Sequence, residues 1–181
     1  MSGARRGATV WLTGLPSAGK STIATEVAAR LRARGRGVEV LDGDEIRASL
    51  SAGLGFGPAD RRTNVERIGF VAELLASHGV LALAPVIAPY ADSREAVRRH
   101  HRDRDTAYVE VHVATPVEVC SARDVKGLYA RRAAGEISGL TGVDDPYEVP
   151  TAPDLRLATQ DRSAAQAADA VLALLGERGL L

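Results

Sequence analysis

The sequence has few aromatic residues, a single cysteine and no excess charge of either sign. Aromatic residues make up 4% of the chain, so the core must be built mainly from Val, Leu, Ile and Ala. One cysteine, Cys120, excludes an intramolecular disulfide framework and is typical of a protein in a reducing cytoplasm, where we place this chain. We expect Cys120 on a helix as a small core residue, because free cysteine is among the most buried residue types.

Long apolar runs are absent as well. No stretch approaches the ~18 residues that a membrane-spanning helix needs, so we expect no membrane contact. The 23 basic residues balance the 23 acidic ones, which argues against a general nucleic-acid binder but leaves room for a local basic pocket. With 181 residues, the chain is long enough for one domain with its own core, and we expect a single domain over residues 1–181.

Short apolar runs alternate along the chain with patterns of helical spacing. This alternation predicts an α/β fold: a three-layer α/β/α sandwich around a mainly parallel five-stranded sheet, with its active site beyond the carboxyl ends of the strands. The run at 80–87 is apolar throughout, so we expect it to be central in the sheet. The other expected strands are 8–13, 38–41, 107–113 and 155–158, and the expected helices are 21–34, 44–50, 59–77, 93–104, one opened by Pro116, and 163–175.

The segment at about 123–147 differs from the rest of the chain. It is rich in Arg, Lys and Gly and has little apolar periodicity. We interpret it as a mobile lid over the active site.

A glycine-rich loop lies between the first expected strand and helix. Gly14-x-x-x-x-Gly19-Lys20-Ser21 matches the Walker A pattern, which predicts a fold of the P-loop NTPase type. Its glycines let successive backbone N–H groups face an anion, Lys20 would reach the β- and γ-phosphates, and the Ser21 hydroxyl would ligate Mg²⁺. The alternative is a glycine turn that binds nothing. A strand, the full motif and a helix rarely occur together by chance, which argues against this alternative. We assign ATP binding to Gly14, Leu15, Pro16, Ser17, Ala18, Gly19, Lys20, Ser21 and Thr22.

Two acids, Asp42 and Asp44, follow the second expected strand. One of them can hold water on the magnesium ion, and the other can orient or deprotonate an acceptor hydroxyl. Asp44 could instead cap the next helix, and the two roles are compatible. We favour the functional interpretation and predict Asp42 as a magnesium residue, through water, beside Ser21.

Arginines and one aromatic residue lie further along the chain. Arg47, Arg61 and Arg62 could pair their planar guanidinium groups with a phosphate or sulfate, although most arginines are solvated charges on helix faces. Phe56 lies in a Gly/Pro loop, where it could stack on a base or turn into the core, and the sequence favours neither.

These residues, in this order, resemble the adenylylsulfate kinase family. The resemblance covers residues 10–159, and the segments 126–129 (Lys-Gly-Leu-Tyr) and 141–148 (Thr-Gly-Val-Asp-Asp-Pro-Tyr-Glu) are more specific than the phosphate loop. The other matching stretches are 14–21, 41–44 with Arg47, 54–56, 60–61 with Asn64, 87–90, 123–125 and 135–137.

The resemblance implies that ATP and adenylylsulfate give ADP and 3′-phosphoadenylylsulfate (PAPS), with the ribose 3′-hydroxyl as acceptor. It places Lys20, Asp42, Asp44 and Lys126 at the reaction centre and adds Arg123 to the ATP contacts. It implies that Phe56 stacks on the acceptor adenine and that Arg47, Arg61 and Asn64 hold the phosphosulfate. The remaining implied acceptor contacts are Asp44, Ile87, Ala88, Lys126, Gly127, Leu128 and Leu140. The family also implies a homodimer.

Two positions depart from the family pattern. Many relatives have a serine, which can be phosphorylated in some, where this chain has Ala88. A phosphoserine is impossible at this position, and direct in-line transfer is the simplest remaining route. Relatives commonly have phenylalanine in place of Leu140, which packs on a base without a π-face. If one stacking contact contributes ~1–3 kcal/mol, acceptor affinity falls about tenfold or more unless other contacts compensate.

Two alternatives stay open at this point. One is a P-loop kinase for a related acceptor, such as a nucleotide, a sugar acid or an antibiotic. The other is a regulatory nucleotide-binding module without turnover, against which the presence of Lys20, Asp42, Asp44 and Lys126 argues. The four histidines form no convincing ligand set, so we expect only the Mg²⁺ that accompanies ATP.

Overall fold

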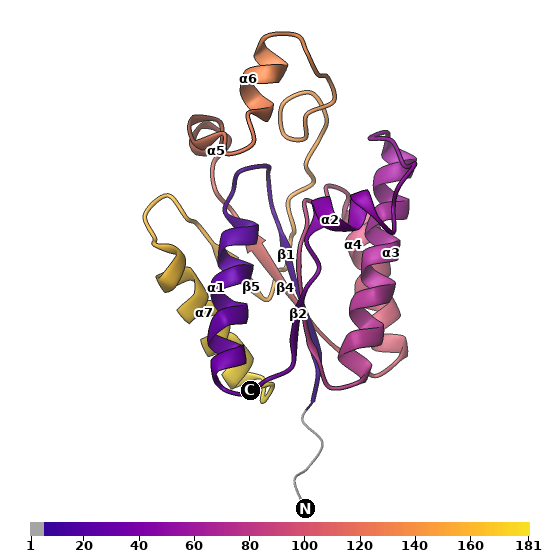
Figure 1. Cartoon of the computed structure of the whole chain (residues 1–181), viewed down its shortest axis with the longest axis vertical. Coiled ribbons are helices and arrows are strands. Elements are labelled where there is room, and N and C mark those ends of the chain that lie inside the picture. The colour runs from indigo at the N-terminus through magenta and orange to yellow at the C-terminus, as the bar shows by residue number, and fades with distance from the viewer. Residues whose placement is uncertain (1–5) are drawn as a thin grey trace, which may run out of the picture.

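The computed structural model describes residues 6–181, which form an α/β fold (Figure 1). The strands are β1 (Ala8–Thr13), β2 (Val38–Val40), β3 (Leu81–Pro85), β4 (Ala107–Val113) and β5 (Leu155–Leu157). The helices are α1 (Lys20–Ala33), α2 (Gly43–Ala48), α3 (Pro58–Ser77), α4 (Ala91–Asp103), α5 (Val117–Arg123), α6 (Leu128–Ala133) and α7 (Ala164–Glu177). Within these residues, no helix is long and apolar enough to cross a membrane.

The five strands form one parallel sheet in the order β2-β3-β1-β4-β5. The strand at 80–87 is central, as expected, in that β3 lies inside the sheet between β2 and β1, although the middle place belongs to β1. Every residue of β1 and of β3 is buried, so an uninterrupted apolar run cannot distinguish the middle strand from its neighbour. The central place of β1 puts the loop that follows it between the loops of β3 and β4.

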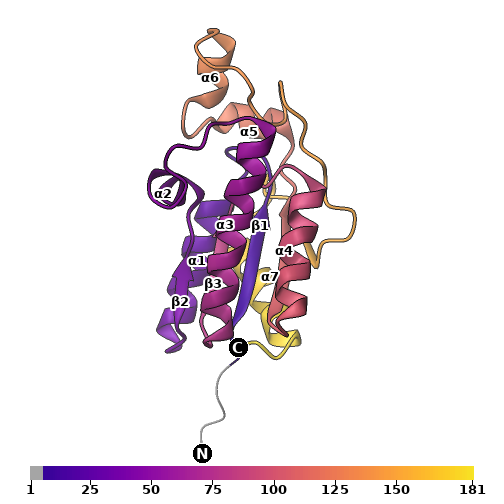
Figure 2. The same ribbon diagram turned by 90° about the vertical axis from the view of Figure 1, so that its right-hand side faces the viewer.

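Helices cover both faces of the sheet, as Figures 1 and 2 show. Helices α1 and α7 pack on one face and α3 and α4 on the other. The side chains of β1 alternate between these layers: Val10 and Leu12 join the core under α1 and α7, and Trp11 joins the core under α3 and α4. This alternation confirms the three-layer sandwich. Cys120 is fully buried on α5, as expected.

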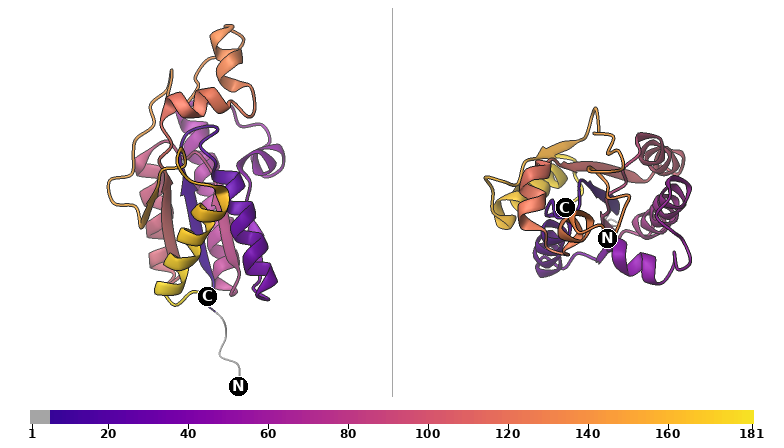
Figure 3. Two further views of the ribbon diagram at one scale, coloured as in Figure 1. Left: turned by 90° about the vertical axis from the view of Figure 1, so that its left-hand side faces the viewer. Right: turned by 90° about the horizontal axis from the view of Figure 1, so that it is seen from above.

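The segment at 123–147 rises above the carboxyl ends of the strands (Figure 3). It contains the six-residue helix α6, which the sequence did not predict because the segment has little apolar periodicity. The Asp124 carboxylate accepts hydrogen bonds from the first free backbone N–H groups of this helix, at Tyr129 and Ala130. Tyr129 is itself buried, so this part of the lid packs on the domain rather than only covering it.

Candidate active site

The phosphate loop joins β1 to α1 in a tight backbone path. A side chain at Gly14 would bring its Cβ within 2.5 Å of the Val113 carbonyl oxygen, so only glycine fits where the loop leaves the sheet. Gly19 has a φ of 105° immediately before the helix begins at Lys20. The Lys20 ammonium folds back and donates to the carbonyls of Gly14 at 3.0 Å and Leu15 at 2.7 Å. The loop is therefore shaped around its own lysine.

Lys20 is a buried cation, with 8% of its surface exposed. Burial lowers the pKa of its ammonium group from 10.5 to about 8, because the charged form loses water, and the neighbouring Lys126 adds to this effect. The carboxylates of Asp42 and Asp44 act in the opposite direction. Such a cation is suited to an anionic ligand, which would supply the counter-charge that the folded chain lacks.

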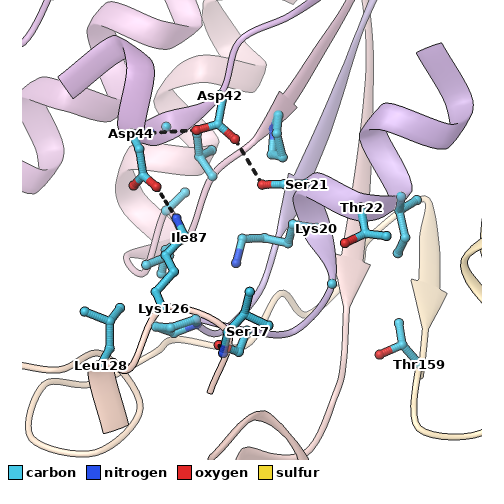
Figure 4. A pocket seen from close by; sticks show the side chains of 18 of the residues that line it. Ser17, Lys20, Ser21, Thr22, Asp42, Asp44, Ile87, Lys126, Leu128 and Thr159 are labelled. Carbon is cyan, nitrogen blue, oxygen red and sulfur yellow. Dashed lines mark hydrogen bonds and ion pairs between the residues drawn. The ribbon is translucent and has the colours of Figure 1, made fainter. Parts of the chain in front are cut away.

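Two oxygen groups face each other beside Lys20, as Figure 4 shows. The Ser21 hydroxyl donates to one carboxylate oxygen of Asp42 at 3.0 Å, and the other oxygen accepts from the Asp44 backbone N–H at 3.0 Å. Asp42, and not Asp44, is therefore the N-cap of α2, because that helix begins at Gly43. A hydroxyl and a carboxylate are ligands of the kind that Mg²⁺ prefers, so Ser21 and Asp42 fit the predicted metal role.

Asp44 and Lys126 meet across the mouth of the site. The Lys126 ammonium forms an ion pair and hydrogen bond with the Asp44 carboxylate, which joins the lid to α2 (Figure 4). Both side chains are more than half exposed, so this pair adds little to the stability of the fold. Its effect is to bring the lid lysine to the carboxylate that the sequence assigned to the reaction centre.

A cavity of about 590 Å³ connects these groups. This volume lies within the range of small-molecule sites. Most of the predicted site residues line it: Pro16, Ser17, Gly19, Lys20, Ser21, Thr22, Asp42, Asp44, Arg47, Phe56, Arg61, Asn64, Ile87, Ala88, Arg123, Lys126 and Leu128. Gly14, Leu15, Ala18 and Gly127 are not part of the lining and belong to the backbone that shapes it.

Leu140 lies elsewhere. Its side chain is 7% exposed and belongs to the larger hydrophobic core, and it does not line the cavity. An acceptor contact by Leu140 therefore stays a prediction, and in this structure the side chain is stabilised by apolar packing.

Phe56 forms an exposed part of the cavity wall. Its ring is 68% exposed, and the Arg47 guanidinium lies 4.5 Å from the ring centroid while donating to the Gly55 carbonyl at 2.9 Å. The sequence left open whether Phe56 enters the core, and the structure places it at the cavity. An exposed aromatic ring on a ligand-sized cavity offers a surface on which a base can stack.

The two arginines at the start of α3 lie in different places. Arg61 is buried and lines the cavity, whereas Arg62 points away, pairs with Asp92 at 3.0 Å and stacks on Tyr90. Consecutive helical residues face different directions, so residue type alone could not distinguish them, whereas the family resemblance named Arg61 only.

The loop after β3 forms the wall opposite the phosphate loop. Ala88 is buried in the left-handed region, with a φ of 43°, and its carbonyl accepts from Arg94 at 2.6 Å. The Thr13 hydroxyl donates to the Ile87 carbonyl at 2.5 Å. Sequence reasoning missed Thr13 and Arg94 because they support the cavity wall from behind.

Thr159 is a lining residue that sequence reasoning did not assign. Its hydroxyl donates to the Ala18 carbonyl at 3.0 Å, and the guanidinium of Arg123 donates to the Thr159 hydroxyl and carbonyl, each at 2.9 Å. These bonds join the end of β5 and the beginning of the lid to the phosphate loop. A lone threonine after a weak strand carries no motif that would have revealed this role.

Replacing Lys20 with methionine is expected to stabilise the nucleotide-free protein at pH 7 by about 1 kcal/mol, within an upper bound of roughly 3 kcal/mol set by its lowered pKa. Buried Lys20⁺ lowers stability fully below pH 8. This penalty disappears as the pH rises from about 8, where folded Lys20 deprotonates, towards 10.5, where the unfolded chain does. The gain should therefore shrink between pH 7 and 9.5.

Urea unfolding at several pH values measures this gain, with Arg34→Met as the control because Arg34 is an exposed cation at the other end of the same helix. Magnesium-ATP should stabilise the wild type and not Lys20→Met. A loss of stability in Lys20→Met at pH 7 would contradict the electrostatic assignment.

Known proteins are similar to this chain over nearly its whole length. The family model for adenylylsulphate kinase matches residues 6–158. An adenylyl-sulfate kinase of Synechococcus is 50% identical over 175 residues, covering 97% of this chain and 98% of the relative. An adenylyl-sulfate kinase of Myxococcus xanthus is 50% identical over 179 residues, covering 99% and 96%.

A solved structure is similar to the same extent. The Mycobacterium tuberculosis APS kinase, in complex with AMPPNP and APS, superposes with a TM-score of 0.92 at 47% identity, covering 95% of this chain and 99% of that one. The family match, the sequence identity and the superposition agree with the site built above, and the chain belongs to the adenylylsulfate kinase family.

Proposed function

We propose that this chain transfers the γ-phosphoryl group of ATP to the ribose 3′-hydroxyl of adenylylsulfate, giving ADP and PAPS. The observation that carries the proposal is that one cavity joins the Lys20 phosphate loop to a wall containing Phe56, Asn64 and Ala88, with Asp44 at its edge. A relative at 47% identity has been solved with AMPPNP and APS, an ATP analogue and an acceptor of the proposed kind.

The donor half of the mechanism rests on the phosphate loop. Its backbone N–H groups and Lys20 would hold the β- and γ-phosphates, with Lys20 exchanging its carbonyl partners for phosphate oxygens. Ser21 and Asp42 would hold Mg²⁺, which supplies positive charge for the phosphate oxygens when it is bound. Arg123 and Thr159 keep the loop in place from the side of β5.

The acceptor half rests on the opposite wall. Phe56 would stack on the adenine, and Arg47, Arg61 and Asn64 would hold the phosphosulfate. Asp44 would orient the 3′-hydroxyl and take its proton as the new P–O bond forms and the bond from the γ-phosphorus to the ADP oxygen breaks. Lys126, which pairs with Asp44 in this structure, would lie near the phosphoryl group during its transfer.

Transfer would be direct and in line. Ala88 is a buried methyl side chain on the cavity wall, so a phosphoserine at this position is impossible. The lid would keep water from taking the phosphoryl group.

A different acceptor remains the second candidate function. The reason to consider it is that Leu140 stands where relatives commonly have phenylalanine, so an aromatic contact to the acceptor base is absent.

Among adenylylsulfate, other nucleotides, sugar acids and aminoglycosides, adenylylsulfate should support by far the fastest ADP release with magnesium-ATP. A coupled ADP assay measures this, with each acceptor omitted in turn as the control for ATP hydrolysis. Turnover of a sugar or a drug without turnover of adenylylsulfate would reject the proposal, and tight ATP binding without any turnover would favour a regulatory module.

Phe56→Ala should raise the KM for adenylylsulfate by about tenfold, as the loss of one stacking contact predicts, and leave the KM for ATP unchanged. The matched control is Phe70→Ala. Phe70 is the other phenylalanine of the chain, is 52% exposed on α3 and does not line the cavity. If the two substitutions changed both KM values equally, the assignment of Phe56 to the acceptor site would be wrong.

We also propose a cytoplasmic homodimer. The single buried thiol of Cys120 supports the reducing compartment, and a hexameric APS kinase of Thiobacillus denitrificans, at 35% identity, supports self-association in the family. The mass of the purified chain by light scattering should equal two protomers. A monomer across the micromolar range would exclude the dimer.

A further inference from the structure

The second half of the lid contains a short self-bonded turn, which we call the strap and define as residues 139–148. The Leu140 carbonyl accepts from the backbone N–H groups of Val143, Asp144 and Asp145, and the Gly142 N–H donates to the Asp145 carbonyl at 2.7 Å. The strap descends from α6 along the domain towards β5 (Figure 1). Its sequence is the most specific family segment of the chain, yet Leu140, Gly142, Asp145 and Tyr147 do not line the cavity.

The strap holds the guanidinium of Arg61. Arg61 is 8% exposed and lies on α3 at the acceptor wall. Its Nη1 donates to the Thr141 hydroxyl at 2.5 Å, and its Nη2 donates to the Gly139 carbonyl at 2.6 Å and pairs with Asp145 at 3.2 Å. Its Nε donates to the Phe56 carbonyl at 2.6 Å. All three nitrogens of the group are therefore bound before any ligand arrives.

The far end of the strap supports the opposite part of the same wall. The Thr13 hydroxyl gives its proton to the Ile87 carbonyl, so the Tyr147 hydroxyl donates to Thr13, at 2.9 Å. Arg94 donates to the Ala88 and Glu148 carbonyls, each at 2.6 Å. The strap thus contacts both the arginine and the loop between which the acceptor would lie.

The middle of the strap lies against the phosphate loop. A Cβ at Gly142 would come within 2.4 Å of Leu15, and the φ of 86° at this position also favours glycine. The strap backbone at Gly142 therefore packs closely on the Leu15 side chain of the phosphate loop.

We propose that Thr141 and Asp145 are positioning residues that orient Arg61 on the acceptor wall, an inference that rests on the proposed function. An arginine side chain has many rotamers, and ordering it on binding lowers affinity. Asp145 also gives the buried guanidinium a counter-charge, without which burial would be unfavourable. With both contacts in place, Arg61 presents a preformed edge to the phosphosulfate end of the acceptor.

The position of this contact predicts a particular kinetic effect. The phosphosulfate is remote from the reacting 3′-hydroxyl, so contacts to it are equally strong in the ground state and the transition state. Loss of such contacts raises KM and leaves kcat unchanged. A strap that merely kept the lid folded would instead change stability and the KM of both substrates.

Asp145→Asn should raise the KM for adenylylsulfate by about tenfold, with kcat and the KM for ATP within about twofold of the wild type. The matched control is Asp144→Asn, the same substitution one residue earlier, where the carboxylate pairs with Arg132 and not with Arg61. Thr141→Val should act like Asp145→Asn, and Thr141→Ser should restore the wild-type KM. In an Arg61→Lys background, Asp145→Asn should add less than about twofold.

A readout without turnover separates this inference from the proposed function. In ¹⁵N NMR spectra, the Nη–H signals of Arg61, assigned by their loss in Arg61→Lys, should be protected from exchange in the wild type and in Asp144→Asn. They should exchange at least about tenfold faster in Asp145→Asn, which removes the charged partner of Nη2. Wild-type protein that fails to turn over adenylylsulfate but shows this protection refutes the function alone.

Two results would overturn the positioning role. One is an unchanged Arg61 signal and an unchanged KM in Asp145→Asn. The other is an equal rise of both KM values together with a lower unfolding temperature, which would make the strap a structural element of the lid.

Discussion

The site is organised around one buried ammonium group, that of Lys20, at the carboxyl end of the central strand. Because β1 is central, the loops of β3 and β4 flank the phosphate loop, and β2 brings Asp42 and Asp44 within electrostatic reach of Lys20. Helix α1 begins at Lys20, so the lysine side chain and the helix N-terminus face the same space. A nearby anion would therefore interact with the lysine, the helix dipole and the loop N–H groups together.

Each of the two hydrophobic cores holds one wall of the site in place. The core under α1 and α7 fixes the phosphate loop, and it includes Tyr129, whose hydroxyl donates to the Pro16 carbonyl at 3.0 Å. The core under α3 and α4 fixes the acceptor wall, because Ala88 belongs to it and α3 carries Arg61 and Asn64. Donor and acceptor walls thus rest on opposite faces of the sheet, and the cavity lies where the two layers meet above it.

How far the sequence predicts this structure depends on the distance over which each feature is determined. The phosphate loop is local: its glycines and Lys20 act within eight residues, and the structure agrees with the motif. The N-cap of α2 depends on the residue at which the helix begins. Because α2 begins at Gly43, Asp42 is the cap, although the sequence pattern fits Asp44 equally well. The strap partners of Arg61 lie about 80 residues further along the chain, whereas helix and strand spacing patterns relate only residues that are a few positions apart. The burial of Leu140 has the same origin, since only the folded strap shows that its side chain packs with the core.

Burial separates the lid contacts that shape the site from those that close it. The Lys126–Asp44 pair and the bond from the Val125 N–H to the Ser17 hydroxyl, at 3.2 Å, are exposed, so water can replace either partner at little cost. The contacts of Arg61 with the strap are largely buried, and breaking them would leave a cation without its counter-charge or a donor without an acceptor. Breaking the contacts of Lys126 and Val125 would therefore cost little, whereas breaking those of Arg61 would cost much more, so the acceptor wall is held more firmly than the turn above it.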